Sequence, residues 1–188
     1  MSRSDLRTSV AAILAGALIF AGHGGELVFG SPSDLVGAVF VGLWSVGIVG
    51  LGVALWGLRG VITGTRLGRI GMRLALVGLG LLALFAIQVV VELIRTSEIP
   101  ENFILFALGF LLILVGQLLF ARDLRPALGR AWLLPIAAVV GLVVALTAGD
   151  NPIHDVGLFV FEGAWIALGV ALLRVQQRGR PHTALAMV

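Results

Sequence analysis

The stretch that decides the fold lies near the end of the chain, where residues 155–174 read DVGLFVFEGAWIALGVALLR. A helix needs roughly 20 apolar residues to cross a hydrocarbon core about 30 Å thick, and this stretch has that length. Residues 34–44, which read DLVGAVFVGLW, match residues 155–165 at five of eleven positions. Val41 stands where the later copy has Glu162. An acid so deep in an apolar run marks this helix as unusual.

The composition indicates that lipid is the main solvent of this protein. Only 12% of the 188 residues are charged and 59% are hydrophobic, whereas soluble domains carry about 25% charged residues. The chain has no Cys, Lys or Tyr, which excludes disulfides, thiolate metal sites and Schiff-base chemistry. Its basic residues are all Arg and lie between apolar runs, which argues against nucleic acid as a partner. The Arg-only, Ala- and Gly-rich composition indicates a prokaryotic protein.

Six segments of spanning length follow one another and predict an all-α, polytopic integral membrane protein. Continuous apolar character without strict alternation favours transmembrane helices over a barrel. We expect one transmembrane domain, residues 1–188, built as three helical hairpins and followed by a cytoplasmic tail at 174–188. The expected helices cover residues 8–25, 35–58, 71–94, 102–121, 131–148 and 156–173.

The arginines alternate between connections and therefore predict the topology. Twelve of the thirteen fall at the N-terminus, in the second and fourth connections or in the tail, and Arg95 is the exception. By the positive-inside rule, this pattern places both termini in the cytoplasm and the protein in the inner (plasma) membrane.

The even-numbered helices share an opening pattern, which indicates an internal repeat of hairpins. A proline stops the preceding element, an acid meets the positive end of the helix dipole, and a glycine allows another backbone to approach closely. The three copies comprise Pro32, Asp34 and Gly42; Pro100, Glu101 and Gly109; and Pro152, Asp155 and Gly163.

This Pro–acid–Gly pattern in three hairpins resembles the HdeD-like small membrane proteins, and the likeness covers most of the chain. The resemblance implies a six-helix fold and a role in stress, acid resistance in particular. It implies no catalytic residues.

Glu162 is the first candidate for a functional residue. It lies seven residues after Asp155, about 10 Å deeper along the same face, where an acid costs a few kcal/mol and usually faces the bundle or a water-filled cavity. It either binds a proton or cation or hydrogen-bonds a neighbouring helix. Gln88 and Glu92, one turn apart, either line the same outward cavity or, for Glu92, pair with Arg95. Gln117 is expected to join helices through a hydrogen bond worth about 1 kcal/mol.

Two histidines form a second candidate site. His23 and His154 lie at the outer ends of the first and last expected helices, near Glu26 and Asp155. Together they would bind a divalent metal or form a pH-sensitive cluster, since histidine titrates between about pH 5 and 8. The alternative is two unrelated loop histidines. No cofactor is predicted.

The second connection supplies a third candidate site. Arg66, Arg69 and Arg73 would hold the anionic head group of a lipid at the cytoplasmic face. The same arginines also suffice to set the topology.

Three functions follow from these candidates. The first is a non-enzymatic, stress-related membrane protein or the accessory subunit of a complex, with the lipid bilayer and either a membrane-protein partner or further copies of itself as partners. The second is a small transporter or proton-coupled permease that uses Glu162. The third is a metal- or cofactor-binding membrane subunit that uses His23 and His154.

Overall fold

Helices account for the fold of the described chain. The computed structural model describes residues 3–29, 35–59, 65–96, 104–148 and 152–178, and no strand occurs within these ranges, so the all-α class is confirmed. The six long helices are α1 (Arg3–Phe29), α2 (Leu35–Leu58), α3 (Arg66–Thr96), α4 (Ile104–Ala121), α6 (Leu134–Ala148) and α7 (Ile153–Arg178). A short helical connection, η1 (Arg122–Leu124), α5 (Arg125–Leu128) and η2 (Gly129–Leu133), joins α4 to α6.

Several boundaries differ from the prediction. Helix α7 runs to Arg178, so the predicted tail begins as helix; its Arg and Gln residues are good helix formers. The expected helix 131–148 starts as 3₁₀ helix and becomes α-helical at Leu134. Gly129 explains the interruption, because its φ of 55° ends α5 in a conformation that favours glycine.

Membrane-spanning potential, judged from length and apolarity, is found in five stretches of the described chain rather than the six expected. Four of them coincide with α1, α2, α3 and α7, and the fifth is the continuous stretch Ile104–Ala148, which contains α4, the connection and α6. Helix α6 has 15 residues, or about 22 Å of rise, and is short for a span on its own. By length and composition, these stretches of the described chain are apolar enough to cross a membrane.

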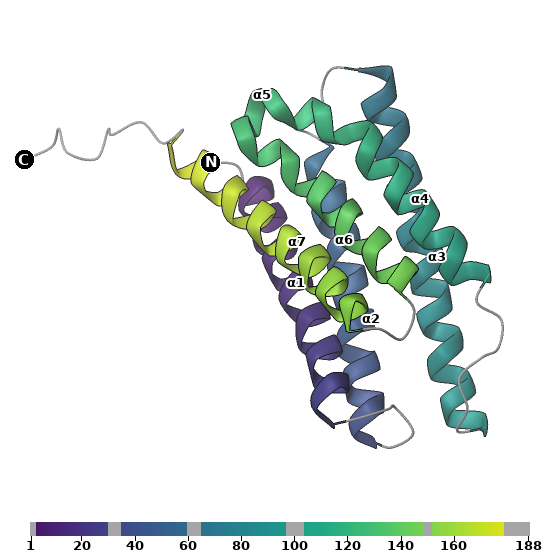
Figure 1. Ribbon diagram of the computed structural model, residues 1–188. Helices are drawn as coiled ribbons and strands as arrows, with labels where there is room; N and C mark the ends of the chain where they lie inside the picture. Colours follow the sequence, from purple (N-terminus) through teal and green to yellow (C-terminus); the bar gives the residue numbers. More distant parts are fainter. Residues whose placement is uncertain (1–2, 30–34, 60–64, 97–103, 149–151, 179–188) are drawn as a thin grey trace, which may run out of the picture.

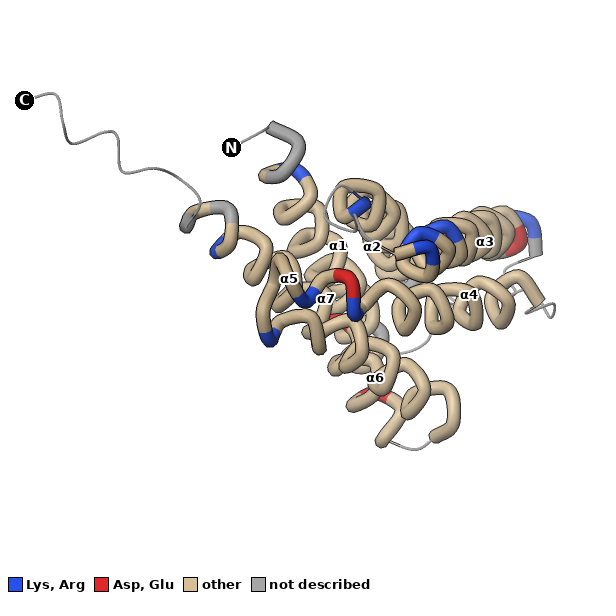
Figure 2. The backbone as a smooth tube through the Cα atoms, turned by 90° about the horizontal axis from the view of Figure 1, so that it is seen from above, with Lys and Arg blue, Asp and Glu red and all other residues tan. Residues whose placement is uncertain are grey.

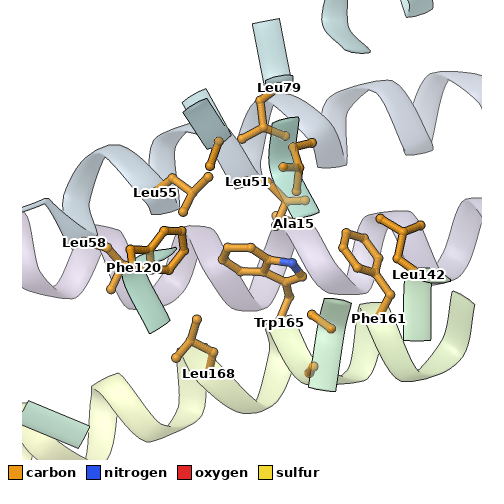
Figure 3. Packing of buried hydrophobic residues seen from close by; sticks show 14 of the residues in the cluster. Ala15, Leu51, Leu55, Leu58, Leu79, Phe120, Leu142, Phe161, Trp165 and Leu168 are labelled. Atoms are coloured by element: carbon orange, nitrogen blue, oxygen red, sulfur yellow. The ribbon is translucent and has the colours of Figure 1, made fainter. Parts of the chain in front are cut away.

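The long helices close into a ring. Each packs chiefly against its two neighbours in chain order, and α7 returns to pack on α1 (Figure 1). Trp165 of α7 lies inside the ring, close to Phe120, Phe161 and Leu55 (Figure 3). Large apolar side chains such as Val28, Phe29 and Leu67 remain exposed on the outside, as expected for a surface that faces lipid.

Glycines set the closest approaches between helices. A Cβ atom added to Gly78 of α3 would lie 2.5 Å from the Gly109 carbonyl oxygen of α4, and Gly71 meets Gly116 in the same way. The expected close approach is therefore confirmed at Gly109. It is wrong at Gly42 and Gly163, where an added Cβ would meet nothing within 4 Å. The glycines of the repeated pattern on α2 and α7 therefore do not form close contacts between helices.

One end of the bundle carries most of the described arginines. Figure 2, seen from above, shows them at the start of α1, the end of α2, the start of α3 and the α4–α6 connection. Thr65 caps α3 by accepting a hydrogen bond from Gly68 N, and its hydroxyl donates to Asp123 Oδ2 at 2.8 Å. This bond joins the second connection to the fourth.

The start of α7 shows how one Pro–acid pair works. Pro152 precedes α7, and its carbonyl accepts a hydrogen bond from Val156 N. Asp155 lies in the first turn of the helix. Of the other two pairs, Pro32–Asp34 and Pro100–Glu101, both lie outside the described residues.

Candidate functional site: a histidine between two acids

Helix α7 presents two acids to helix α1. Asp155 and Glu162 are two turns apart on the same face of α7, as the spacing predicts. Their side chains differ in environment, because Asp155 is 31% exposed and Glu162 is 1% exposed. Asp155 is therefore accessible from the outside at the start of α7, and Glu162 lies in the packed interior.

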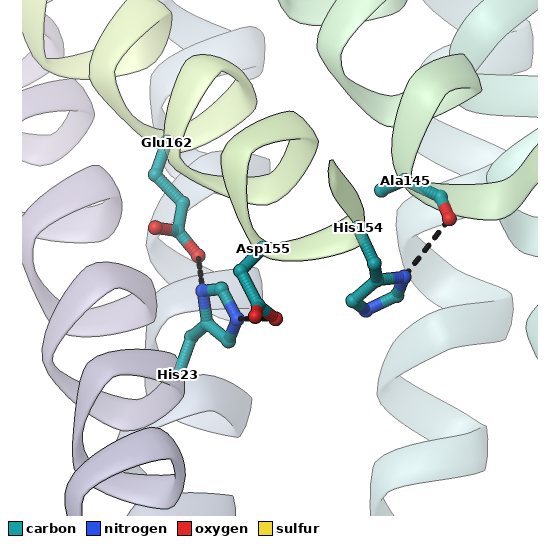
Figure 4. Close-up of polar contacts among 5 residues, drawn as sticks. All are labelled: His23, Ala145, His154, Asp155 and Glu162. Atoms are coloured by element: carbon teal, nitrogen blue, oxygen red, sulfur yellow. Dashed lines mark hydrogen bonds and ion pairs between the residues drawn. The ribbon is translucent and has the colours of Figure 1, made fainter. Parts of the chain in front are cut away.

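His23 lies between these acids. Its Nε2 atom is 3.4 Å from Asp155 Oδ1, and its Nδ1 atom is 3.3 Å from Glu162 Oε1 (Figure 4). The contact depends on a close approach of α1 to α7: a Cβ atom on Gly16 would lie 3.0 Å from the Glu162 carbonyl oxygen. Gly16 lies two turns before His23 on α1, so it allows the imidazole to reach both acids.

The two contacts of His23 are not equivalent. The contact with Asp155 is a hydrogen bond. The contact with Glu162 is within ion-pair distance, but its angle does not make a hydrogen bond, so His23 Nδ1 and Glu162 Oε2 have no hydrogen-bond partner among the described residues. The ring of Phe159 lies 4.9 Å from the imidazole, measured between centroids, and covers it with an apolar surface. A small movement of either side chain would complete the second hydrogen bond.

This arrangement is suited to binding and passing protons. An imidazole has two nitrogens that can each carry a proton, and here each nitrogen faces a different carboxylate. A protonated His23 would be an ion-pair partner for both acids, and such a partner offsets the cost of a buried carboxylate. A proton that reaches Asp155 from water can move to Glu162 through the ring.

His154 does not join this cluster. Its Nδ1 atom lies 2.9 Å from the carbonyl oxygen of Ala145 on α6, away from His23 (Figure 4). No group of three His, Cys, Asp or Glu side chains within the described ranges is arranged to hold a metal ion. The Glu26 side chain lies outside the described residues. The structure thus gives no support to a metal site shared by the two histidines.

Gln88 and Glu92 are placed on a different part of the ring. Both are half-buried on α3, whose main packing partners are α2 and α4, whereas the cluster is carried by α1 and α7. The predicted cavity shared by Gln88, Glu92 and Glu162 is therefore not formed around this cluster.

The arginine site is assembled differently from the prediction. Arg69 and Arg73 line a cavity of about 410 Å³ at the α2–α3 junction, together with Trp56 of α2 and Arg59, the residue that follows α2. Arg66 is not among its lining residues. Sequence reasoning missed Arg59 as a site residue, although its position three residues after an interfacial tryptophan was a usable signal.

Comparisons with family models, curated proteins and solved structures give no match to this chain. The fold and composition define its class as an all-helical protein with helices apolar enough to cross a membrane. The resemblance to HdeD-like proteins rests on the Pro–acid–Gly pattern.

Proposed function

We propose that this chain is a non-enzymatic, multi-pass protein of the plasma membrane that binds protons at Asp155, His23 and Glu162 and responds to acid. In this proposal α4 and α6 cross the membrane separately, which gives six crossings and three hairpins. Both termini are cytoplasmic, since the arginine-rich end takes the cytoplasmic side. The cluster then opens to the extracytoplasmic side.

The observation that carries the proposal is the position of His23 between a partly exposed acid and a buried one. A lone buried glutamate has an ordinary explanation, because it can be protonated and hydrogen-bonded to a neighbour. This explanation does not account for Asp155, a second acid two turns away that contacts the same imidazole. Three proton-exchanging groups in contact, graded from exposed to buried, supply a path by which external pH reaches the interior.

The packing beyond Glu162 favours a site that is open on one side. The same helix continues toward the arginine-rich end with Trp165, Leu168 and Leu172, all buried. This apolar column supplies no proton acceptor on the part of α7 between Glu162 and Arg174, because the indole N–H of Trp165, which has no hydrogen-bond partner in the described structure, can only donate. A proton that enters at Asp155 therefore leaves by the same route, which suits a protein that senses acid and agrees with the role implied by the HdeD-like resemblance.

A proton-coupled permease is the second candidate. Glu162 Oε2 is buried without a hydrogen-bond partner in the described structure, and a free carboxylate oxygen inside a bundle is a common feature of coupling sites. If the protein is a permease, the structure, in which the site opens on one side only, represents one state of the transport cycle.

Infrared spectra of the reconstituted protein, recorded during a pH titration, test proton binding. The chain has ten Asp and Glu residues, so we expect the C=O band of protonated carboxyl groups to have one component from Glu162 in the wild type, and we expect that component alone to be lost in Glu162→Gln. His23→Gln should move the pH at which that component appears. His154→Gln is the matched control, because it removes a neighbouring histidine outside the cluster, and it should leave the titration unchanged. A wild-type spectrum equal to that of Glu162→Gln would contradict the proposal.

Proton flux into liposomes loaded with a pH-sensitive dye separates the two candidates. An acid-responsive protein gives flux equal to that of empty liposomes while its infrared titration is intact. A permease gives flux above that background when its solute is present, and Glu162→Gln abolishes it while His154→Gln does not.

A further inference from the structure

The junction of α2 and α3 is packed less closely than the α1–α2, α3–α4 and α6–α7 interfaces. No described glycine of α2 or α3 brings these two helices into close contact, and Gly52 and Gly80 would meet nothing within 4 Å if a Cβ were added. Two hollows remain along this junction as a result. One lies at the arginine-rich end and the other further along the same pair of helices.

The hollow at the arginine-rich end combines charge with an apolar wall. Arg59, Arg69 and Arg73 supply three guanidinium groups, and Met72 and Leu76 supply the apolar side. The Arg59 guanidinium carbon lies 4.0 Å from the centroid of the Trp56 ring, a cation–π contact that holds the side chain over the hollow. Guanidinium groups match the geometry of phosphate oxygens.

Among the described residues, no acid competes for these three arginines. No carboxylate in the described parts of the chain lies within ion-pair distance of them. Asp123, an acid at the same end of the bundle, accepts hydrogen bonds from the backbone N–H and the hydroxyl of Thr65. The positive charge of the hollow is therefore available to an anion from outside the chain.

The second hollow makes a lipid the best match for that anion. It has a volume of about 310 Å³ and an almost entirely apolar lining that includes Val46 and Val49 of α2 and Ala83, Ile87 and Val90 of α3. Ten residues separate Arg59 from Val49, or about 15 Å along the helix. A soluble anion would use the arginine end alone. A phospholipid would use both, with its phosphate at the arginines and an acyl chain along α2 and α3.

We propose that the α2–α3 junction binds an anionic phospholipid of the cytoplasmic leaflet through Arg59, Arg69 and Arg73. Trp56 is exposed on the outside of α2, and in this proposal it anchors the helix at the membrane interface, as tryptophan often does. Arg66 contributes to the overall charge of this end but not to the site. This inference is independent of proton binding at His23, which lies on another pair of helices.

Native mass spectrometry of the delipidated protein tests the site by titration with phosphatidylglycerol, phosphatidylcholine or inorganic phosphate. We expect one phosphatidylglycerol to be retained in preference to phosphatidylcholine. Arg69→Gln/Arg73→Gln should weaken this binding roughly thirtyfold, since each arginine near an anionic lipid contributes on the order of tenfold or less. Arg122→Gln/Arg125→Gln is the matched control, because it removes the same charge from the same end outside the hollow, and it should bind as the wild type does.

Three results would overturn the proposal. Equal loss in the two double variants would mean that the lipid responds to overall charge only. Equal retention of both lipids by the wild type would mean that the site does not select lipids with a net negative head group. Displacement of the lipid by millimolar inorganic phosphate would identify a soluble-anion site. If the double variant fails to fold, as judged by its melting temperature, Arg59→Gln on the other helix makes the same test with an expected loss of severalfold.

Discussion

At the scale of single residues, two buried polar side chains have opposite surroundings. Glu162 faces His23 across the α1–α7 interface. Gln117 on α4 is fully buried, and neither atom of its amide has a hydrogen-bond partner in the described structure. Its predicted role in joining helices by a hydrogen bond is therefore not realised there. A buried amide without a partner costs about 1–3 kcal/mol. The cost of burying Glu162 is offset by His23, which lies within ion-pair distance.

Gln117→Met should stabilise the protein, because methionine keeps the length of the side chain and removes the unbonded amide. We expect a gain of about 1 kcal/mol, or a melting temperature about 2–4 °C higher in detergent. Gln88→Met is the matched control on a half-buried position, and it should leave the melting temperature unchanged. A lower melting temperature for Gln117→Met would mean that the amide has a partner after all.

At the scale of elements, glycine pairs decide which helices lie closest. Gly71 and Gly78 of α3 are seven residues apart, as are Gly109 and Gly116 of α4, and the two pairs meet in antiparallel order. A spacing of seven residues returns to nearly the same side of a helix, so these glycines form a narrow seam along which two backbones touch. The α2–α3 junction has no such seam, which is why it has hollows.

Gly78→Ala should separate α3 from α4, because the new methyl group would lie 2.5 Å from the Gly109 carbonyl oxygen. We expect a loss of about 1–3 kcal/mol, typical of overpacking, measured as a lower melting temperature. Gly80→Ala lies two residues away on a side of the helix with open space, and it should gain about 0.5–1 kcal/mol from the better helix former. Equal effects of the two substitutions would show that the seam does not hold the pair together.

At the scale of the whole molecule, the described charges are divided between the two ends of the bundle. Described arginines at the start of α1, the end of α2 and the start of α3 lie at one end of the ring. The partly exposed Asp155 lies in the first turn of α7, and this helix runs toward the arginine-rich end. The count of crossings depends on the connection from α4 to α6, which contains Gly129 and is helical throughout.

Cysteine labelling tests the six-crossing topology directly, because the natural chain has no cysteine. Ala127→Cys in the α4–α6 connection should react with a membrane-impermeant maleimide only after the cells are opened. Ile153→Cys at the start of α7 should react in intact cells. Both positions are exposed in the structure. Labelling of Ala127→Cys in intact cells would contradict a cytoplasmic connection and with it the proposed crossing of α4 and α6.

The sequence predicted the helical class and most helix positions, because apolar length is a local property. It also identified Glu162 as a candidate, since an acid is costly inside an apolar run. His23 and Asp155 were candidates because histidines and acids occur together at the outer ends of the first and last expected helices. It did not predict that His23 meets both acids while His154 turns to Ala145, because that depends on how α1 rotates against α7. The lipid hollow was found in part: the arginines of α3 are local, whereas Arg59 enters through a contact between two helices.

The separation of His23 and Asp155 along the chain, 132 residues, has a consequence for biosynthesis. Hairpins made of consecutive helices can assemble as they leave the ribosome, because their glycine contacts are close in sequence. His23 gains its two contacts only after α7, the last helix, has been synthesised. Glu162 in turn depends on a histidine that was synthesised much earlier. Nascent chains that stop short of α7 therefore lack both of the acids that contact His23.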